Sequence, residues 1–262
     1  MLNCLAFDIE TVPDVAFGRR LHGLGDLPDD DVAQLMLMRR RQQVGHEFLA
    51  LPQHRVVAIS VVLRQGGGLR VWSLGEAESD EAELVRRFFE GIERFSPDLV
   101  SWNGSGFDLP VLHYRALRHG ISAPRYWESG ERDASFRFNN YLNRFHSRHT
   151  DLMDVLAGYQ ASGRARLDEV AVLLGLPGKM GMSGADVYGA WRDGGIERIR
   201  DYCETDAVNT YLVYLHYQHM RGTLDDTDLD RETALVRDTL GTLPGEHWQA
   251  FLGAWRPAEG GG

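Results

Sequence analysis

The segment LNCLAFDIET, residues 2–11, alternates in hydropathy and predicts a β-strand whose two faces differ in chemistry. One face carries two small residues followed by two acids: Cys4, Ala6, Asp8 and Glu10. The other face is apolar: Leu5, Phe7 and Ile9. Two carboxylates therefore share one face at the C-terminal end of a strand that otherwise suits a protein core. A solvated strand end is the alternative explanation for the pair.

Composition limits the class of protein. The 262 residues are 43% hydrophobic and 25% charged, which is ordinary for a soluble globular protein. The formal net charge of −10 argues against a protein that binds nucleic acid through a broad positive field. It leaves room for clustered acids that hold metal ions and meet phosphate through those ions.

The sequence shows no clear targeting signal and no disulfide pattern. No apolar run approaches the length of a membrane span, and Asp8 interrupts the first apolar stretch before a signal-peptide core forms. We therefore expect a cytoplasmic protein with no membrane partner. Cys4 and Cys203 are too few for a disulfide framework, and we expect both to be buried free thiols.

The segments that follow predict a mixed α/β sheet. Two strand-like runs, residues 54–64 and 69–74, are joined by QGGG as a hairpin, which forces an antiparallel neighbour. An amphipathic helix over 79–95, a short buried strand in DLVSWNG and a helix from Pro110 to Gly120 come next. We expect a central sheet of about five strands, one of them antiparallel, flanked by helices.

Domain organisation is expected to be simple. Residues 1–221 form one domain, interrupted over about 14–53 by a polar, irregular insertion with one helix in DDDVAQLMLMRRRQQ. The arginines that end this helix are expected to be solvated. Residues 222–262 are expected to form an acidic helical extension with a flexible tail, and this extension either contacts a protein partner or aids solubility.

Two further acids, Asp108 and Asp206, occupy positions that bring them toward Asp8 and Glu10. Asp108 lies in WNGSGFDLP, between a buried strand and the next helix. Tyr202 and Asp206 are four residues apart in the helix IRDYCETDAVNTYLVYLHY, so both face one side. Since ligands of open α/β sheets collect where strands end, we expect all four acids to converge. A helix N-cap is the alternative for Asp108.

Four converging carboxylates require counter-charge. Unit charges about 4 Å apart repel by about 4 kcal/mol at an effective dielectric constant of about 20. Hard divalent cations that bind oxygen ligands, Mg²⁺ or Mn²⁺, would offset this repulsion. Two such ions stabilise both the attacking and the leaving oxygen of a displacement at phosphorus, which is phosphodiester hydrolysis. The Tyr202 phenol would then orient the attacking water.

FDIET, WNGSGFD and YCETD resemble, in order, the three exonuclease motifs of the DEDD superfamily, also called DnaQ-like, whose fold is ribonuclease-H-like. The form Tyr-x-x-x-Asp of the third motif resembles the DEDDy branch. The whole pattern, over about residues 1–220, is most similar to stand-alone proteins related to the proofreading domain of family-B DNA polymerases.

This resemblance implies roles for individual residues. Asp8, Glu10, Asp108 and Asp206 would bind two metal ions, and Tyr202 would position the nucleophile. Thr11, Asn103 and Phe107 match motif positions near the 3′ end of the substrate.

A basic, aromatic segment is a candidate for binding a single-stranded nucleic acid. FRFNNYLNRFHSRH, residues 136–149, holds three arginines, including Arg137 and Arg144, and four aromatic rings but no acid. Rings that stack on bases and arginines that contact phosphates are typical of single-strand binding. The alternative is that the rings pack into the core. Lys179 is a loop cation that is expected to reach phosphate.

The leading functional hypothesis is a metal-dependent 3′-5′ exonuclease that acts on single-stranded DNA ends and releases nucleoside monophosphates. An exoribonuclease with the same chemistry is the second hypothesis, because nothing in the motifs reads a 2′-hydroxyl. An inactive nucleic-acid-binding or scaffolding subunit is the third, and the intact acids count against it.

Overall fold

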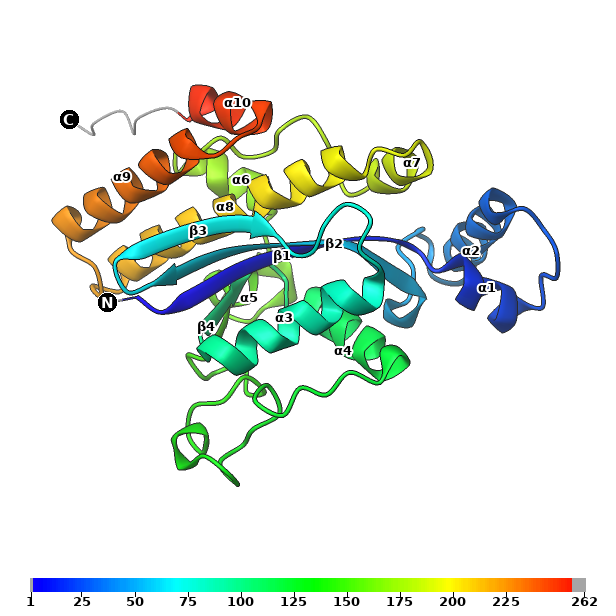
Figure 1. The fold of residues 1–262 in the computed structure, drawn as a ribbon, viewed down its shortest axis with the longest axis horizontal. Coiled ribbons are helices and arrows are strands. Elements are labelled where there is room, and N and C mark those ends of the chain that lie inside the picture. Colours follow the sequence, from blue (N-terminus) through cyan, green and yellow to red (C-terminus); the bar gives the residue numbers. More distant parts are fainter. Residues whose placement is uncertain (1, 256–262) are drawn as a thin grey trace.

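The computed structural model describes residues 2–255, and within them the strands form a five-stranded sheet in the order β3-β2-β1-β4-β5 (Figure 1). The strands are β1 (Cys4–Pro13), β2 (His54–Gln65), β3 (Gly68–Ser73), β4 (Asp98–Ser101) and β5 (His149–Asp151). β2 runs antiparallel to β1 and β3, whereas β1, β4 and β5 run parallel to one another. The predicted mixed sheet with one antiparallel strand, consistent with a ribonuclease-H-like fold, is confirmed.

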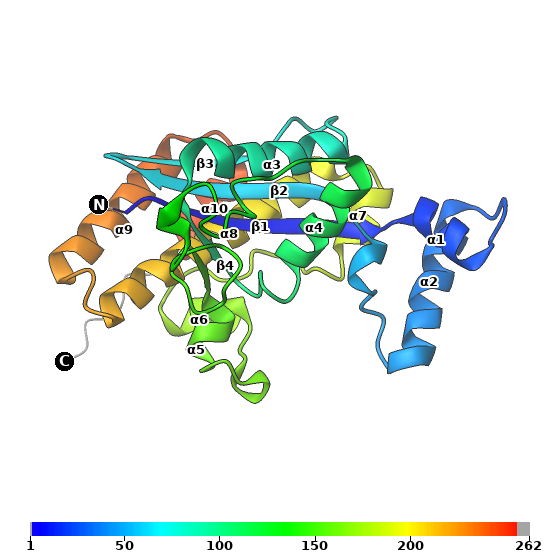
Figure 2. The same ribbon diagram turned by 90° about the horizontal axis from the view of Figure 1, so that it is seen from below.

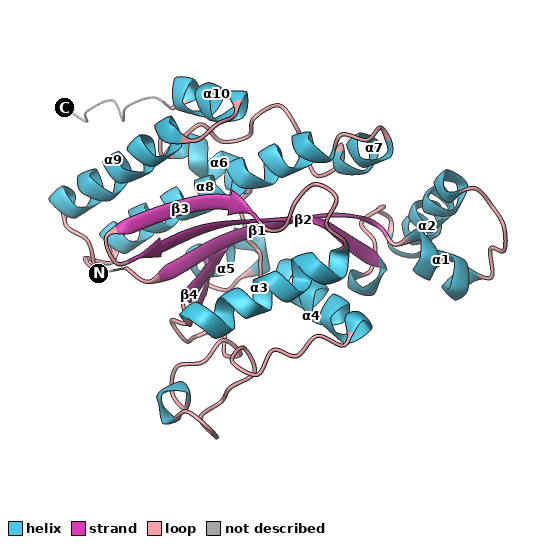
Figure 3. Cartoon of the chain, viewed as in Figure 1, coloured by secondary structure: helices cyan, strands magenta, loops and turns pink. Residues whose placement is uncertain are grey.

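Helices cover both faces of the sheet (Figures 2 and 3). On one face α3 (Glu81–Phe95) and α4 (Asp108–His119) pack against Leu5, Phe7 and Ile9 of β1. On the other face α8 (Ile196–Met220) packs against Cys4 and Ala6. The alternation within β1 therefore serves two separate cores, and both cysteines are buried free thiols, as predicted.

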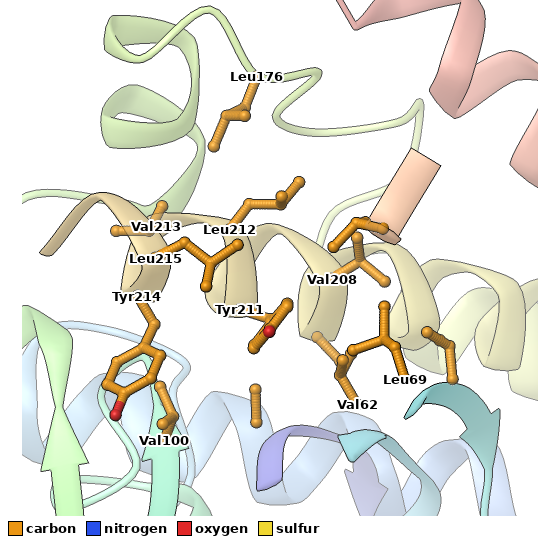
Figure 4. Close-up of a cluster of buried hydrophobic side chains, with 14 of the residues drawn as sticks. Val62, Leu69, Val100, Leu176, Val208, Tyr211, Leu212, Val213, Tyr214 and Leu215 are labelled. Atoms are coloured by element: carbon orange, nitrogen blue, oxygen red, sulfur yellow. The ribbon is translucent and has the colours of Figure 1, made fainter. Parts of the chain in front are cut away.

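Helix α8 is the centre of the second core. Figure 4 shows Tyr211 and Val208 of α8 pointing at Val62 and Leu69 of the sheet. Tyr211 is fully buried, and the neighbouring turns add Leu212 and Leu215 to the same cluster. No helix formed by residues 2–255 has the length and hydropathy needed to cross a membrane.

Shorter helices surround this framework. Between β4 and α8 the chain forms, in order, η2 (Ala134–Phe136), α5 (Leu152–Leu156), η3 (Ala161–Gly163), α6 (Leu167–Leu173) and α7 (Val187–Arg192). Asp151 caps α5 by accepting a hydrogen bond from the backbone N–H of Asp154, as expected for an acid at a helix start.

The insertion over 14–53 is a small helical unit that projects beyond the end of the sheet (Figures 1 and 2). It contains α1 (Val15–His22), which the sequence did not predict, α2 (Asp29–Val44), which it did, and η1 (Leu51–Gln53). Val32, Met36 and Leu49 form its own apolar cluster. The backbone N–H of Asp14 donates to the Gln53 carbonyl at 2.8 Å, so the two ends of the insertion meet.

The C-terminal helices α9 (Asp226–Thr242) and α10 (Glu246–Ala254) pack on α8. They contribute to the same core cluster as α8: Val236, Leu240, Trp248, Phe251 and Trp255. The boundary at residue 221 stays a prediction. The flexible tail was predicted at residues 258–262, which lie outside the described residues.

A buried ion pair ties α9 to the sheet. The Arg64 guanidinium of β2 donates to both carboxylate oxygens of Glu232 in α9, at 2.7 and 2.9 Å. The Tyr211 hydroxyl of α8 adds a third bond to Glu232 at 3.3 Å. Both charged side chains are almost completely buried.

We expect Glu232→Ala to lower the free energy of unfolding by about 3–5 kcal/mol, because Arg64 would be left as a buried charge with no carboxylate beside it. Urea unfolding would measure the loss. Arg231→Ala is the matched control, since it breaks the exposed pair of Arg231 with Asp228 and should cost about 1 kcal/mol or less. An equally small cost for Glu232→Ala would contradict a buried pair.

Candidate active site

Three of the four predicted acids meet where β1 lies against α8. One carboxylate oxygen from each of Asp8, Glu10 and Asp206 lies within 4.8 Å of the others. Tyr202 lies beside the same cluster, because the charges of Asp206, Glu10 and Asp8 all raise the pKa of its phenol. The predicted pairing of residues 202 and 206 on one helical face is therefore present in the structure.

The fourth acid approaches from the opposite face of the sheet. Asp108 is the first residue of α4 and is 4% exposed, and the backbone N–H of Ile9 is close enough to oppose the rise in its pKa. Its charge raises the pKa of both Asp8 and Glu10. The helix N-cap is Phe107, so the alternative that Asp108 is the cap is wrong.

A β-bulge accompanies these acids. The pairing of β1 with β2 shifts register between Glu10 and Thr11, so that Glu10 opposes Ala58 whereas Thr11 opposes Val56. Such an irregularity changes the direction in which successive side chains point, and it is common next to functional sites. The extra residue is Val57 of β2, and nothing in the sequence of β2 marks it.

Burial makes every charge in this cluster costly. It raises the pKa of Asp8 and Glu10 well above the usual range, and neighbouring acids raise both further. Burial also raises the pKa of Asp108 to about 7 and that of Asp206 to about 6. Lys179 is close enough to lower the pKa of Glu10 and Asp206. Four carboxylates with one lysine nearby keep an excess of negative charge, and they are the hard oxygen donors that divalent cations require, so the residues present fit Mg²⁺ or Mn²⁺.

Two contacts that support the cluster were not predicted. The Cys203 thiol donates to the Asp8 backbone carbonyl at 3.3 Å and lies 3.5 Å from its carboxylate oxygen Oδ2. The Asn209 side chain donates to the Gly178 carbonyl at 2.9 Å, which attaches to α8 the loop that carries Lys179. No local pattern pairs residues this far apart in sequence, so only the fold reveals them.

The loop that leads to Asp108 is held by Asp151. Its two carboxylate oxygens accept hydrogen bonds from the backbone N–H groups of Asn103 and Ser105, both at 2.9 Å. Asn103 has a φ of 64°, a conformation that asparagine adopts more readily than most residues. Asp151, the N-cap of α5, is therefore also the anchor of the second motif.

A cleft of about 520 Å³ opens beside Glu10. Thr11 and Phe107, two of the residues predicted near the substrate, line it together with His54, and the Thr11 hydroxyl lies 2.9 Å from His54 Nδ1. The insertion supplies another part of the wall: Leu37, Glu47, Phe48 and Leu49. The insertion, predicted to be largely irregular but mostly helical in the structure, thus borders the candidate site.

The structure divides the aromatic segment over 136–149. Phe136 and Tyr141 are buried in the core, whereas Phe138 and Phe145 are exposed. Arg144 pairs with Asp154 at 3.1 Å and lines a hollow of about 150 Å³ with Ser105. Arg137 is exposed, and neither it nor Arg144 lines the cleft beside Glu10.

Two other polar features near the site have a structural role. A cavity of about 700 Å³ on the other side of Tyr188 is lined by equal numbers of arginines and acids, among them the buried pair of Arg115 with Asp14. His247 of α10 lies between two carboxylates of α8, with Nδ1 3.1 Å from Asp201 and Nε2 3.2 Å from Glu204. His247 thus connects α10 to two acids of α8.

Comparisons with known proteins agree with this geometry. Residues 46–255 match the family described as "Predicted 3'-5' exonuclease related to the exonuclease domain of PolB". The matched range contains Asp108, Tyr202 and Asp206, whereas Asp8 and Glu10 precede it.

Curated relatives are DNA polymerases of low identity. The chain is 28% identical to a DNA polymerase of Archaeoglobus fulgidus over 53% of its own length. It is 27% identical to a DNA polymerase of Pyrococcus glycovorans over 76%, and 27% identical to the catalytic polypeptide of DNA polymerase epsilon of Saccharomyces cerevisiae over 82%. It spans only 18%, 27% and 9% of these three relatives, respectively.

We expect Asp108→Asn to raise the melting temperature of the metal-free protein at pH 8, by about 2 °C or more. The pKa of Asp108 is about 7 in the folded protein, above its ordinary 3.8, so its contribution to stability falls as pH rises from about 4 to about 7. The gain should therefore be smaller at pH 5. Thermal unfolding in EDTA at both pH values would measure it, with the exposed Asp238→Asn as control. An equal gain at both values would contradict the raised pKa.

Proposed function

Because this chain belongs to the family of predicted 3′-5′ exonucleases related to the exonuclease domain of PolB, we propose that it is a metal-dependent 3′-5′ exonuclease. In this proposal it shortens single-stranded DNA from the 3′ end and releases nucleoside monophosphates. The observation that carries the proposal is the approach of four acids and one phenol from β1, α4 and α8. The similarity to DNA polymerases supports DNA rather than RNA as substrate.

Asp8, Glu10, Asp108 and Asp206 are assigned to the metal ions in this proposal. Two Mg²⁺ or Mn²⁺ ions, when bound, would neutralise the acids and stabilise the charge that develops on the phosphate oxygens. The chain's own part is to hold the four carboxylates in place. The Cys203 thiol, the Ile9 backbone N–H and the burial of the cluster do this.

Tyr202 is assigned to the orientation of the attacking water. Burial and the neighbouring acids raise the pKa of its phenol well above the usual range, so the hydroxyl keeps its proton and acts as a donor. The phenol lies beside Asp206, so a water molecule next to Asp206 can accept a hydrogen bond from it. Lys179 supplies a positive charge near the acids and is assigned to the substrate phosphate.

The remaining predicted residues mark a path for the strand. Thr11 and Phe107 line the cleft beside Glu10 and are assigned to the 3′-terminal nucleotide, with Asn103 on the loop that precedes Phe107. Arg144 borders a hollow on the far side of this loop, through Ser105, and is assigned with Arg137 to upstream phosphates. A cytoplasmic location and a protein partner for the acidic region 222–262 complete the proposal.

The decisive experiment uses 5′-labelled single-stranded DNA and RNA of one sequence, incubated with the full chain and either Mg²⁺ or Mn²⁺, with EDTA as control. A ladder that shortens from the 3′ end of DNA is the expected result. Shortening of RNA alone would favour the exoribonuclease. Binding without cleavage in either metal would favour an inactive nucleic-acid-binding subunit.

We expect Asp8→Ala to reduce cleavage by at least about 100-fold, because it removes a metal ligand that no other residue can replace. Its melting temperature should change little or rise, since repulsion within the cluster decreases. Cleavage assays and thermal unfolding in EDTA would measure the two effects. Cleavage at the wild-type rate in Asp8→Ala would contradict the assignment of Asp8 as a metal ligand.

We expect Tyr202→Phe to lower kcat by about 100-fold while Mn²⁺ binding stays nearly unchanged, because the phenol orients water and holds no metal. Single-turnover cleavage and Mn²⁺ titration would separate these effects. Tyr214→Phe removes a hydroxyl from a buried tyrosine of the same helix and is the matched control. Loss of Mn²⁺ binding in Tyr202→Phe would mean that Tyr202 serves the structure of the site instead.

A further inference from the structure

One exposed aromatic ring stands beside the acids. Phe48, in the insertion between β1 and β2, is 54% exposed and lines the cleft that also contains Glu10. Its ring rests on two others, with centroids 5.3 Å from both His54 and Phe107. His54 and Phe107 are themselves in edge contact at 5.0 Å. The three rings form one cluster with a free face at Phe48.

The backbone around Phe48 is held in place by side chains. The Arg40 guanidinium of α2 donates to the Phe48 carbonyl at 2.8 Å. His54 Nε2 lies 3.3 Å from the Leu49 carbonyl and so carries the proton, which leaves Nδ1 to accept from the Thr11 hydroxyl in the neutral ring. Thr11 directly follows Glu10. A short chain of contacts therefore connects the ring to the strand that carries the acids.

The cleft suits a neutral, flat group. Its lining contains Glu10 and Glu47 but no lysine or arginine, so a phosphate would meet only like charge there. The other wall is made of small residues, Gly184, Ala185 and Gly189, and a β-carbon placed at either glycine would meet no atom within 4 Å. A volume of about 520 Å³ is in the range of pockets that hold small ligands.

We propose that Phe48 is the stacking platform for the base of the 3′-terminal nucleotide, so that the helical insertion over 14–53 is part of the active site. This inference rests on the proposed exonuclease function. The base would lie between Phe48 and the glycine-containing wall, with its phosphate toward the acids and Lys179. Because a base held between two walls has left its pairing partner, the cleft selects unpaired 3′ ends of any sequence.

The test compares two 5′-labelled single strands of DNA that differ only at the 3′-terminal nucleotide, which carries adenine in one and is abasic in the other. The full wild-type chain should prefer the adenine end by about 10-fold in kcat/KM, since stacking of a base on an aromatic ring is lost at the abasic end. Phe48→Ala should reduce this ratio to about 1, whereas Phe48→Trp should keep it.

The ratio separates binding of the base from general damage to the protein, because misfolding lowers cleavage of both ends alike. Trp127→Ala is the matched control: this ring is 53% exposed, close to the exposure of Phe48, and does not line the cleft, so the ratio should stay at the wild-type value. Arg40→Ala tests a positioning residue. It should lower the ratio by about 3-fold, by freeing the Phe48 backbone, without removing the ring.

The outcomes distinguish the inference from the function on which it rests. A wild-type enzyme that cleaves both ends equally, or a Phe48→Ala variant that keeps the wild-type ratio, overturns the role of Phe48 while the exonuclease function stands. No cleavage of either end by the wild-type chain in Mg²⁺ or Mn²⁺ overturns the proposed function, and the inference falls with it.

Discussion

Electrostatic repulsion among buried carboxylates is the constraint around which this protein is organised. Asp8 and Glu10 come from the central strand, Asp206 from a helix on one face of the sheet and Asp108 from a helix on the other. The fold brings them together despite the cost of burying like charges, which divalent cations would offset. The Cys203 thiol, the nearby backbone N–H of Ile9 and the charge of Lys179 reduce that cost only in part.

Strand β1 links the core to the site. Its apolar face supports α3 and α4, its small residues support α8, and its C-terminal end carries the acids opposite a bulge in β2. The stability of the two cores therefore fixes the position of the acids. The ion pair between Arg64 and Glu232 extends this framework to α9, so the C-terminal helices also support the helix that carries Tyr202 and Asp206.

The location of the insertion over 14–53 explains how it contributes to the site. Its ends are joined at Asp14 and Gln53, and its own apolar cluster keeps α1 and α2 together beyond the end of the sheet. From there it supplies Phe48 and Leu49 to the cleft beside Glu10. This cleft is largely apolar and its lining contains no lysine or arginine, whereas the acids beside it suit metal ions. The site is therefore divided into a part for a neutral ring and a part for phosphate.

The sequence by itself determined the features that depend on local backbone geometry. Alternation showed which face of β1 carries the acids, the hairpin identified the antiparallel strand, and the spacing of Tyr202 and Asp206 placed both on one helical face. Only the tertiary structure decided which distant segments meet. It joined Asp108 to Ile9, Cys203 to Asp8 and Phe48 to His54 and Phe107, and it buried half of the rings between 136 and 149. Side-chain periodicity repeats within a few residues and can be read from one segment, whereas these contacts depend on how separate segments pack, which no single segment encodes.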